Sequence, residues 1–264
     1  MSIFNEDLLT NEVAFITGGG SGIGAEIVKT LAAHGAKVAI CGRTQEKLDA
    51  VAKEVEDAGG ECLAMTADVR DPDQLKAVVA AIKERWDKLT ILVNSAAGNF
   101  LCPAAALSAN GFSTVIDIDL KGTFNACKAA FPLLSQNGGN IINISATLQY
   151  TGTPMQIHAS SAKAGIDALT RTLAVEWGGA NIRVNAVAPG PIDNTPGMSK
   201  LAPGDVKEKL TQQIPLNRFG SCREIADSVL FLVSSASSYT TGSILVVDGG
   251  QWIATAGLGS ISAF

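Results

Sequence analysis

Residues 17–24 read Thr17-Gly18-Gly19-Gly20-Ser21-Gly22-Ile23-Gly24 and join a short apolar run to a helical pattern. Glycines at such a junction let the chain turn tightly and let backbone N–H groups approach a pyrophosphate at the start of the helix. A Gly-x-Gly-x-x-Gly match alone is weak, but the spacing Thr-Gly-x-x-x-Gly-x-Gly between a strand and a helix is more specific. It predicts a dinucleotide-binding turn; the alternative is a glycine-rich turn without a ligand.

On both sides of this turn, apolar runs alternate with amphipathic patterns along the chain. Leu48, Val51, Ala52 and Val55 recur at the spacing of one buried helical face. Strands that are apolar on both sides and separated by helices predict a parallel sheet covered on both faces. The expected strands are 13–17, 37–41, 61–66, 89–94, 139–145, 181–187 and 243–247. The predicted fold is therefore α/β, a single doubly wound parallel sheet of the Rossmann type with about seven strands, in one domain over residues 1–264.

Two segments interrupt this alternation. Residues 95–112 carry glycine, alanine and asparagine with two embedded phenylalanines, and residues 189–217 are rich in proline. Both follow expected strands, so both should lie at the carboxyl edge of the sheet, where ligands bind in this architecture. They are interpreted as substrate loops, with ordinary surface loops as the alternative.

Composition excludes several classes of protein. The chain has 264 residues, a formal net charge of -5 and 47% hydrophobic residues, which argues against nucleic-acid binding and against disorder. The five cysteines form no CxxC pair, so neither a disulfide framework nor a metal site is expected. No apolar stretch is long enough for a membrane span. Because the N-terminus lacks a secretory pattern and the chain ends Ser262-Ala263-Phe264 rather than Ser-Lys-Leu, a cytoplasmic location is expected.

The segment after the second expected strand bears on the choice of dinucleotide. An NAD site needs a carboxylate about 20 residues beyond the glycines, whereas this chain has Cys41-Gly42-Arg43-Thr44 there. A guanidinium can clamp a 2′-phosphate, which a carboxylate would repel. We therefore expect NADPH as the cofactor, unless Arg43 only faces solvent at the start of a helix. Asp68, after the third expected strand, suits a hydrogen bond to the adenine amino group.

At this point the sequence resembles the short-chain dehydrogenase/reductase family. The resemblance rests on the glycine stretch 17–24, on Asn94-Ser95-Ala96-Ala97-Gly98, on Lys163 and on Pro189-Gly190-Pro191. It implies homotetramers and a set of cofactor-binding positions. Besides Arg43 and Asp68, these are Gly18, Ser21, Gly22, Ile23, Gly24, Val69, Asn94, Ala96, Lys163, Pro189, Gly190 and Ile192.

The chain departs from the catalytic pattern of this family, which is Asn, Ser, Tyr and Lys. The serine and tyrosine positions are Ala146 and Ala159, and the asparagine position is Asp119. An alanine side chain can neither donate nor accept a proton, and loss of a positioned general acid typically costs about 10²–10⁴-fold in rate. A ketone reductase with this active site would have a low rate of turnover unless Tyr150 served as the general acid.

A narrower resemblance accounts for these losses. Residues 94–103, 118–119, 146–148, 158–163 and 188–192 look like the peroxisomal branch of 2,4-dienoyl-CoA reductases, which also lacks the serine and tyrosine. The resemblance implies NADPH-dependent reduction of a 2,4-dienoyl-CoA to a trans-3-enoyl-CoA in fatty acid β-oxidation, with Asp119 and Lys163 as catalytic residues. For Asp119, a helix cap or a pair with Lys121 is the alternative.

Substrate contacts follow from the same resemblance. Phe100, Ser108 and Asn110 match positions along the acyl-thioester path, and Arg70 and Lys200 match or adjoin basic positions that meet CoA phosphates. Two rivals stay open. One is another reductase of the family that acts on a ketone or enoyl thioester, and the other is a catalytically silent NADPH-binding protein.

Overall fold

The computed structural model describes residues 4–195, 197–198 and 205–254. Its seven strands form one parallel sheet in the order β3-β2-β1-β4-β5-β6-β7. They are β1 Val13–Thr17, β2 Lys37–Gly42, β3 Cys62–Thr66, β4 Ile91–Asn94, β5 Gly139–Ile144, β6 Ile182–Pro189 and β7 Ile244–Val247. The predicted doubly wound sheet is confirmed, and strand ends differ from those expected by at most two residues.

The helices connect successive strands. They are α1 Gly22–Ala33, α2 Gln45–Asp57, α3 Pro72–Trp86, α4 Ala109–Ile116, α5 Gly122–Asn137, α6 Leu148–Thr151, α7 Ile157–Trp177, α9 Asp205–Gln212 and α10 Cys222–Val233. A π-helical turn, η1 Asp117–Lys121, joins α4 to α5, and short 3-10 turns follow at η2 Gly178–Ala180, η3 Ser235–Ser237 and η4 Gln251–Ile253. No helix in the described ranges combines the length and hydropathy of a membrane span.

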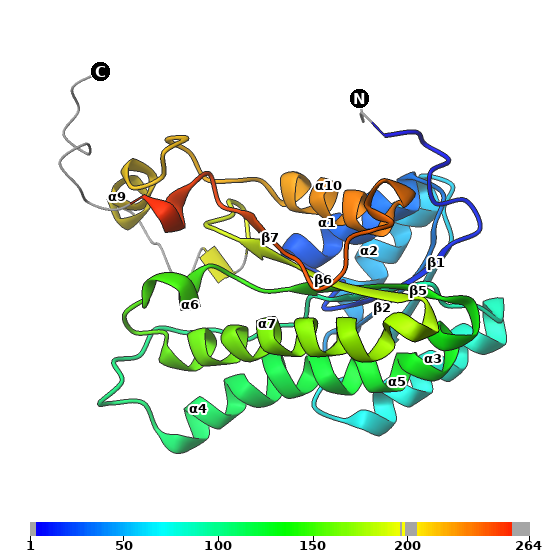
Figure 1. Cartoon of the computed structure of the whole chain (residues 1–264), viewed down its shortest axis with the longest axis horizontal. Coiled ribbons are helices and arrows are strands. Elements are labelled where there is room, and N and C mark those ends of the chain that lie inside the picture. Colours follow the sequence, from blue (N-terminus) through cyan, green and yellow to red (C-terminus); the bar gives the residue numbers. More distant parts are fainter. Residues whose placement is uncertain (1–3, 196, 199–204, 255–264) are drawn as a thin grey trace.

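The sheet is covered on both faces, as Figure 1 shows: α1, α2 and α10 lie on one face, and α3, α5 and α7 on the other. Successive residues of β1 point to opposite faces. Ile16 packs in the core with α1 and α10, whereas Phe15 packs in the core with α3 and α5. Both side chains are fully buried. This two-sided burial explains why the strands are continuous apolar runs rather than alternating patterns.

The order of the strands reverses between β1 and β4. The chain moves outward through β2 and β3 and then returns to the other side of β1. The loops that leave β1 and β4 therefore diverge above the carboxyl edge of the sheet, which creates the crevice in which ligands bind in such folds.

Candidate active site

A cleft of about 1410 Å³ opens at this carboxyl edge. The segments that follow six of the strands line it: 18–24 after β1, 42–48 after β2, 67–69 after β3, 95–99 after β4, 144–148 around the end of β5, and 189–191 after β6. Residues 212–217 and 251–254 complete the wall. Segments far apart in the sequence thus converge on one volume.

The glycine turn forms one end of the cleft. Gly18 has φ +69°, and a Cβ there would lie 2.8 Å from the Cα of Ala96, so the turn leaves no room for a side chain. The Thr17 hydroxyl accepts the N–H groups of Ser95 and Ala96 at 3.2 and 3.3 Å and holds the turn against the next loop. Ser21, at the N-cap of α1, makes no side-chain cap bond. The backbone donors of a helix start without such a cap suit a pyrophosphate, so the residues fit a dinucleotide.

Two basic side chains line the cleft in the segment that follows β2. Arg43 is exposed and lines the cleft, and so does Lys47, in the first turn of α2. Thr44, not Arg43, occupies the N-cap of α2. The sequence analysis missed Lys47, which lies four residues after Arg43 and also lines the cleft.

Asp68 also lines the cleft, but its carboxylate has a protein partner. Arg70 Nε donates to Asp68 Oδ1 at 3.0 Å, and a second guanidinium nitrogen donates to Oδ2. These hydrogen bonds hold the pKa of Asp68 below its usual value. Arg70 is not among the residues of the cleft wall.

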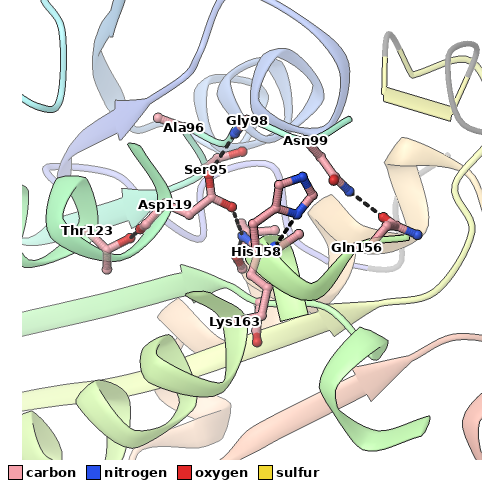
Figure 2. A network of polar contacts seen from close by, with 12 residues as sticks. Ser95, Ala96, Gly98, Asn99, Asp119, Thr123, Gln156, His158 and Lys163 are labelled. Carbon is pink, nitrogen blue, oxygen red and sulfur yellow. Dashed lines mark hydrogen bonds and ion pairs between the residues drawn. The ribbon is translucent and has the colours of Figure 1, made fainter. Parts of the chain in front are cut away.

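The buried end of the cleft contains an ion pair. Lys163 Nζ lies 3.3 Å from Asp119 Oδ2 and donates to the carbonyl oxygen of Ile144 at 2.9 Å. Asp119 Oδ1 accepts the Gly98 N–H at 2.7 Å, and both side chains are almost fully buried. Figure 2 shows the pair between the loop after β4 and helix α7. Since both carboxylate oxygens have donors, the charge is well defined in position.

The π-helical turn explains why Asp119 faces inward. Such turns are rare and often occur at functional sites. Here Asp117 pairs with Lys121 at 2.6 Å on the outside, and the Asp119 carbonyl accepts the Thr123 hydroxyl at 2.6 Å. A pair between Asp119 and Lys121 is therefore wrong. Burial raises the pKa of Asp119, and the Lys163 ammonium and the Gly98 N–H oppose this rise.

The two alanines leave this end of the cleft without a hydroxyl at the usual positions. Ala146 and Ala159 both line the cleft. Tyr150 is not part of the wall: its hydroxyl donates to Asp167 Oδ2 at 2.9 Å. Burial and this hydrogen bond raise the pKa of Tyr150. A phenol that already donates to a carboxylate is poorly placed as an acid for a substrate in the cleft.

The structure brings together most of the predicted site residues. Those in the cleft wall are Gly18, Ser21, Gly22, Ile23, Gly24, Arg43, Asp68, Val69, Ala96, Asp119, Lys163, Pro189 and Gly190. No group of three His, Cys, Asp or Glu residues is arranged for a metal ion within the described ranges.

Other predicted residues lie outside the wall for identifiable reasons. The Asn94 side chain is buried and donates to Asn143 Oδ1, and Ile192 packs in the core. Phe100 packs against the ring of His158. Ser108 caps α4 by accepting the Gly111 N–H, and Asn110 is exposed in the first turn of α4. Lys200 lies outside the described residues.

Two of the polar wall residues that the sequence analysis did not select, Asn99 and Gln156, contact each other. Asn99 follows β4, Gln156 precedes α7, and Asn99 Nδ2 donates to Gln156 Oε1 (Figure 2). A backbone hydrogen bond from the Cys102 N–H to the Met155 carbonyl, at 2.9 Å, joins the same two segments. No local sequence pattern predicts a contact between Asn99 and Gln156, which are 57 residues apart. Asn99 does lie within the motif that carries the narrower resemblance.

A dinucleotide turn at one end of a cleft, with a buried aspartate and lysine at the other, defines a nicotinamide-dependent oxidoreductase. The family model described as enoyl-(acyl carrier protein) reductase matches residues 18–251. The solved structure of a short chain dehydrogenase from Bacillus anthracis has a TM-score of 0.83 and 42% identity, covering 91% of this chain and 96% of that one.

Curated relatives have similar lengths. The peroxisomal 2,4-dienoyl-CoA reductase of Danio rerio, named as (3E)-enoyl-CoA-producing, is 49% identical over 96% of this chain and 86% of its own. A probable 2,4-dienoyl-CoA reductase of Bacillus subtilis, named as (2E)-enoyl-CoA-producing, is 38% identical over 93% of this chain and 98% of its own. The chain belongs to the short-chain dehydrogenase/reductase family, as its motifs predicted, and is an oxidoreductase.

Proposed function

We propose that the protein reduces 2,4-dienoyl-CoA thioesters to trans-3-enoyl-CoA with NADPH, as part of the β-oxidation of unsaturated fatty acids. The observation that carries the proposal is the buried Asp119–Lys163 pair in a cleft with alanine at both hydroxyl positions. Such a site suits a reaction in which the proton ends on carbon rather than on a carbonyl oxygen. The relatives named 2,4-dienoyl-CoA reductase support the substrate class.

NADPH, when bound, supplies a hydride. The proposed contacts for it are Gly18, Ser21, Gly22, Ile23, Gly24, Arg43, Asp68, Val69, Asn94, Ala96, Lys163, Pro189, Gly190 and Ile192. Lys163 would bind the nicotinamide ribose, and Arg43 would bind the 2′-phosphate. Asn94 and Ile192 have side chains directed into the protein, so the proposal for them concerns backbone groups.

The Asp119–Lys163 pair would act on the other half of the reaction. The ammonium stabilises negative charge that develops on the thioester. Asp119 holds this ammonium in place and, together with Gly98, fixes the loop after β4. Segments 95–112 and 189–217 are proposed as substrate loops, with Arg70, Phe100, Ser108, Asn110 and Lys200 as contacts for acyl-CoA. For Arg70 this contact requires release from Asp68.

One assay separates this function from its rivals. NADPH oxidation is followed with 2,4-hexadienoyl-CoA, crotonyl-CoA and acetoacetyl-CoA. The proposal predicts turnover of the diene alone. Turnover of acetoacetyl-CoA or crotonyl-CoA would favour another reductase of the family, and tight NADPH binding without any turnover would favour a silent protein.

Assembly and location are finer proposals. Phe124 on α5 and Val175 on α7 are 48% and 84% exposed, which supports a homotetramer that packs these helices together. Light scattering coupled to chromatography tests it. A cytoplasmic location follows the sequence expectation, whereas the Danio rerio relative carries a peroxisomal name and the Bacillus subtilis relative does not. Imaging of the tagged protein in its source cells decides between a cytoplasmic and a peroxisomal location.

A further inference from the structure

Asp167 on α7 is a buried carboxylate that the proposed reaction does not use. The Ser145 hydroxyl donates to its Oδ1 at 2.6 Å, and Gln149 Nε2 and the Tyr150 hydroxyl each donate to its Oδ2 at 2.9 Å. A buried carboxylate is stable where donors of this kind satisfy its oxygens. Asp167 therefore ties the residue after β5 and the short helix α6 to α7.

Tyr150 connects this cluster to the turn η4, which follows β7. The Tyr150 ring lies 5.3 Å from the Trp252 ring between centroids, at an angle of 56°. The Trp252 N–H donates to Asp248 Oδ2 at 2.7 Å, and the Gly250 N–H donates to Asp248 Oδ1 at 2.8 Å. Figure 1 shows η4, in red, at the same end of the sheet as α6. Asp248 thus holds the backbone of Trp252, and Tyr150 holds its ring.

The Trp252 side chain belongs to the wall of the cleft and is 41% exposed. Ile253, the next residue, is more exposed but is not part of the wall. Helix α6 contributes Leu148 and Thr151 to the wall, whereas Tyr150 itself is not part of it. The ring contact therefore joins two sections of the wall, and Tyr150 supports the indole from outside the cleft. A partly exposed indole in a concave wall is typical of a contact with an apolar ligand.

The proposed substrate has an apolar part that needs such a contact. NADPH is assigned to the glycine turn and Arg43, and the thioester to the Asp119–Lys163 pair. The acyl tail beyond the diene gains affinity by apolar burial, at about fourfold for each buried methylene. The pantetheine arm of CoA carries amides instead, and these require hydrogen-bond partners when they are buried. The indole face therefore suits the tail better than it suits the pantetheine arm.

We propose that Trp252 contacts the acyl tail of the substrate, and that Tyr150, held by Asp167, keeps the indole in place for this contact. The two aromatic rings would thereby set the preference of the enzyme for long chains. The inference rests on the proposed function. Trp252 is a specificity-determining residue, and Tyr150 and Asp167 are positioning residues that act through it.

The experiment compares two chain lengths. The full-length wild type and Trp252→Ala are assayed with NADPH and either 2,4-hexadienoyl-CoA or 2,4-decadienoyl-CoA, which share the thioester and the diene and differ only in the tail. For Trp252→Ala we expect kcat/KM with the decadienoyl substrate to fall about tenfold, through KM, and with the hexadienoyl substrate to change less than twofold. Ile253→Ala, the neighbour outside the wall, is the matched control and should keep both values.

Tyr150→Phe tests the positioning role. The variant keeps the ring but loses the hydrogen bond to Asp167, so we expect kcat/KM to fall about threefold with the decadienoyl substrate and to stay unchanged with the hexadienoyl substrate. Trp252→Phe keeps an aromatic ring beside Tyr150 and should recover most of the preference for the longer chain. These two variants preserve the packing, so they decide the question even if Trp252→Ala does not fold.

A second readout needs no turnover. Hexanoyl-CoA and decanoyl-CoA are titrated into each protein with NADP⁺ present, and the heat of binding gives the two Kd values. The ratio of these Kd values should fall about tenfold in Trp252→Ala and stay at the wild-type value in Ile253→Ala. An equal loss of affinity for both thioesters would place the indole against CoA rather than against the tail and would overturn the inference.

The outcomes separate the two proposals. If the wild type reduces both dienes but Trp252→Ala keeps the wild-type ratio of kcat/KM between them, the inference is wrong and the proposed function stands. A gain with the decadienoyl substrate would show that the indole blocks the tail, which also contradicts the inference. An unchanged ratio in Tyr150→Phe would remove the positioning role of Tyr150. If the wild type reduces neither diene, the proposed function fails and this inference fails with it.

Discussion

The two ends of the cleft differ in the groups that form them, which are mainly backbone groups at one end and side chains at the other. At the adenosine end, which holds the glycine turn, backbone groups form most of the site: Gly18 has a positive φ, and α1 starts without a side-chain cap. The Thr17 hydroxyl holds this turn by accepting the Ser95 N–H. The catalytic end uses side chains: the buried ammonium of Lys163, the buried carboxylate of Asp119 and the Asn99–Gln156 pair. The first end can bind the same cofactor for many reactions, whereas the second decides which reaction follows.

This difference also separates binding from chemistry. Substitutions at the adenosine end should change affinity for the cofactor and leave the chemical step intact. Substitution of Asp119 at the catalytic end, which is not itself a proposed cofactor contact, should change turnover far more than cofactor affinity. The predictions below test that separation, beginning with the largest effect.

Asp119→Asn should cause the largest change. The amide removes the negative charge that holds Lys163, so we expect kcat with 2,4-hexadienoyl-CoA to fall about 10²-fold, while the Kd for NADPH stays within about twofold. Fluorescence titration and steady-state kinetics measure the two quantities. Asp117→Asn, in the same π-helical turn but paired outward with Lys121, is the control and should change neither. An Asp119→Asn enzyme with normal turnover would remove Asp119 from the mechanism.

Arg43→Ala should change the affinity for NADPH rather than turnover. Loss of a charge-assisted contact to the 2′-phosphate should raise the KM for NADPH about 10–100-fold, with little effect on kcat or on the KM for NADH. Lys53→Ala removes an exposed pair with Asp57 within α2 and should leave the KM for both cofactors unchanged. Equal weakening of NADPH and NADH would contradict the assigned role.

Tyr150→Phe tests whether the catalytic end contains a hidden phenol. Because the hydroxyl donates to Asp167 away from the cleft wall, we expect kcat to stay within about twofold of the wild type. The lost hydrogen bond should lower the free energy of unfolding by about 1 kcal/mol, as measured in urea. A loss of turnover of about 10²-fold or more would instead support a ketone reductase with Tyr150 as the acid.

Glu224→Gln should have the smallest effect, and the effect should be on the free energy of unfolding. Glu224 lies in α10, which packs against α1. Glu224 completes the capping box of α10 and pairs with Arg218, which lowers its pKa from 4.5 to about 2. A lowered pKa stabilises the folded state above pH 4.5, and this contribution is lost as the pH falls toward 2. Since the side chain is exposed, we expect a cost of only about 0.5–1 kcal/mol at pH 7.

Urea unfolding of wild type and Glu224→Gln at pH 7 and pH 4 measures this difference, and the gap between them should narrow at the lower pH. A gap that widens on acidification would show that the ion pair and cap do not account for the shift. NADPH affinity should be equal in the two proteins at pH 7.

The sequence predicts the adenosine end better than the catalytic end, for a physical reason. Buried parallel strands and a glycine turn impose local patterns, so the sheet and residues 17–24 are visible without a structure. Arg43 is equally visible, because it follows a strand directly. The catalytic end depends on contacts across the fold.

Three residues show this limit. The proposed contact of Arg70 with CoA phosphates stays a prediction; in the structure its guanidinium binds Asp68. Phe100 was assigned to the acyl path, and it packs on His158. Asn99 was not selected, yet it lies in the cleft wall and binds Gln156. Each of these residues has a partner side chain far away in the sequence or around a turn, and a single sequence does not give that partner.

The most direct test of the central claim is the fate of each hydrogen in the product. A 2,4-dienoyl-CoA is reduced with NADPH deuterated at the transferred position, in ordinary water, and the product is examined by NMR. A site that reduces an extended conjugated thioester without a phenol predicts deuterium at C5, a solvent proton at C2 and the double bond between C3 and C4. Deuterium at C3, or reduction of acetoacetyl-CoA in preference to the diene, would contradict it.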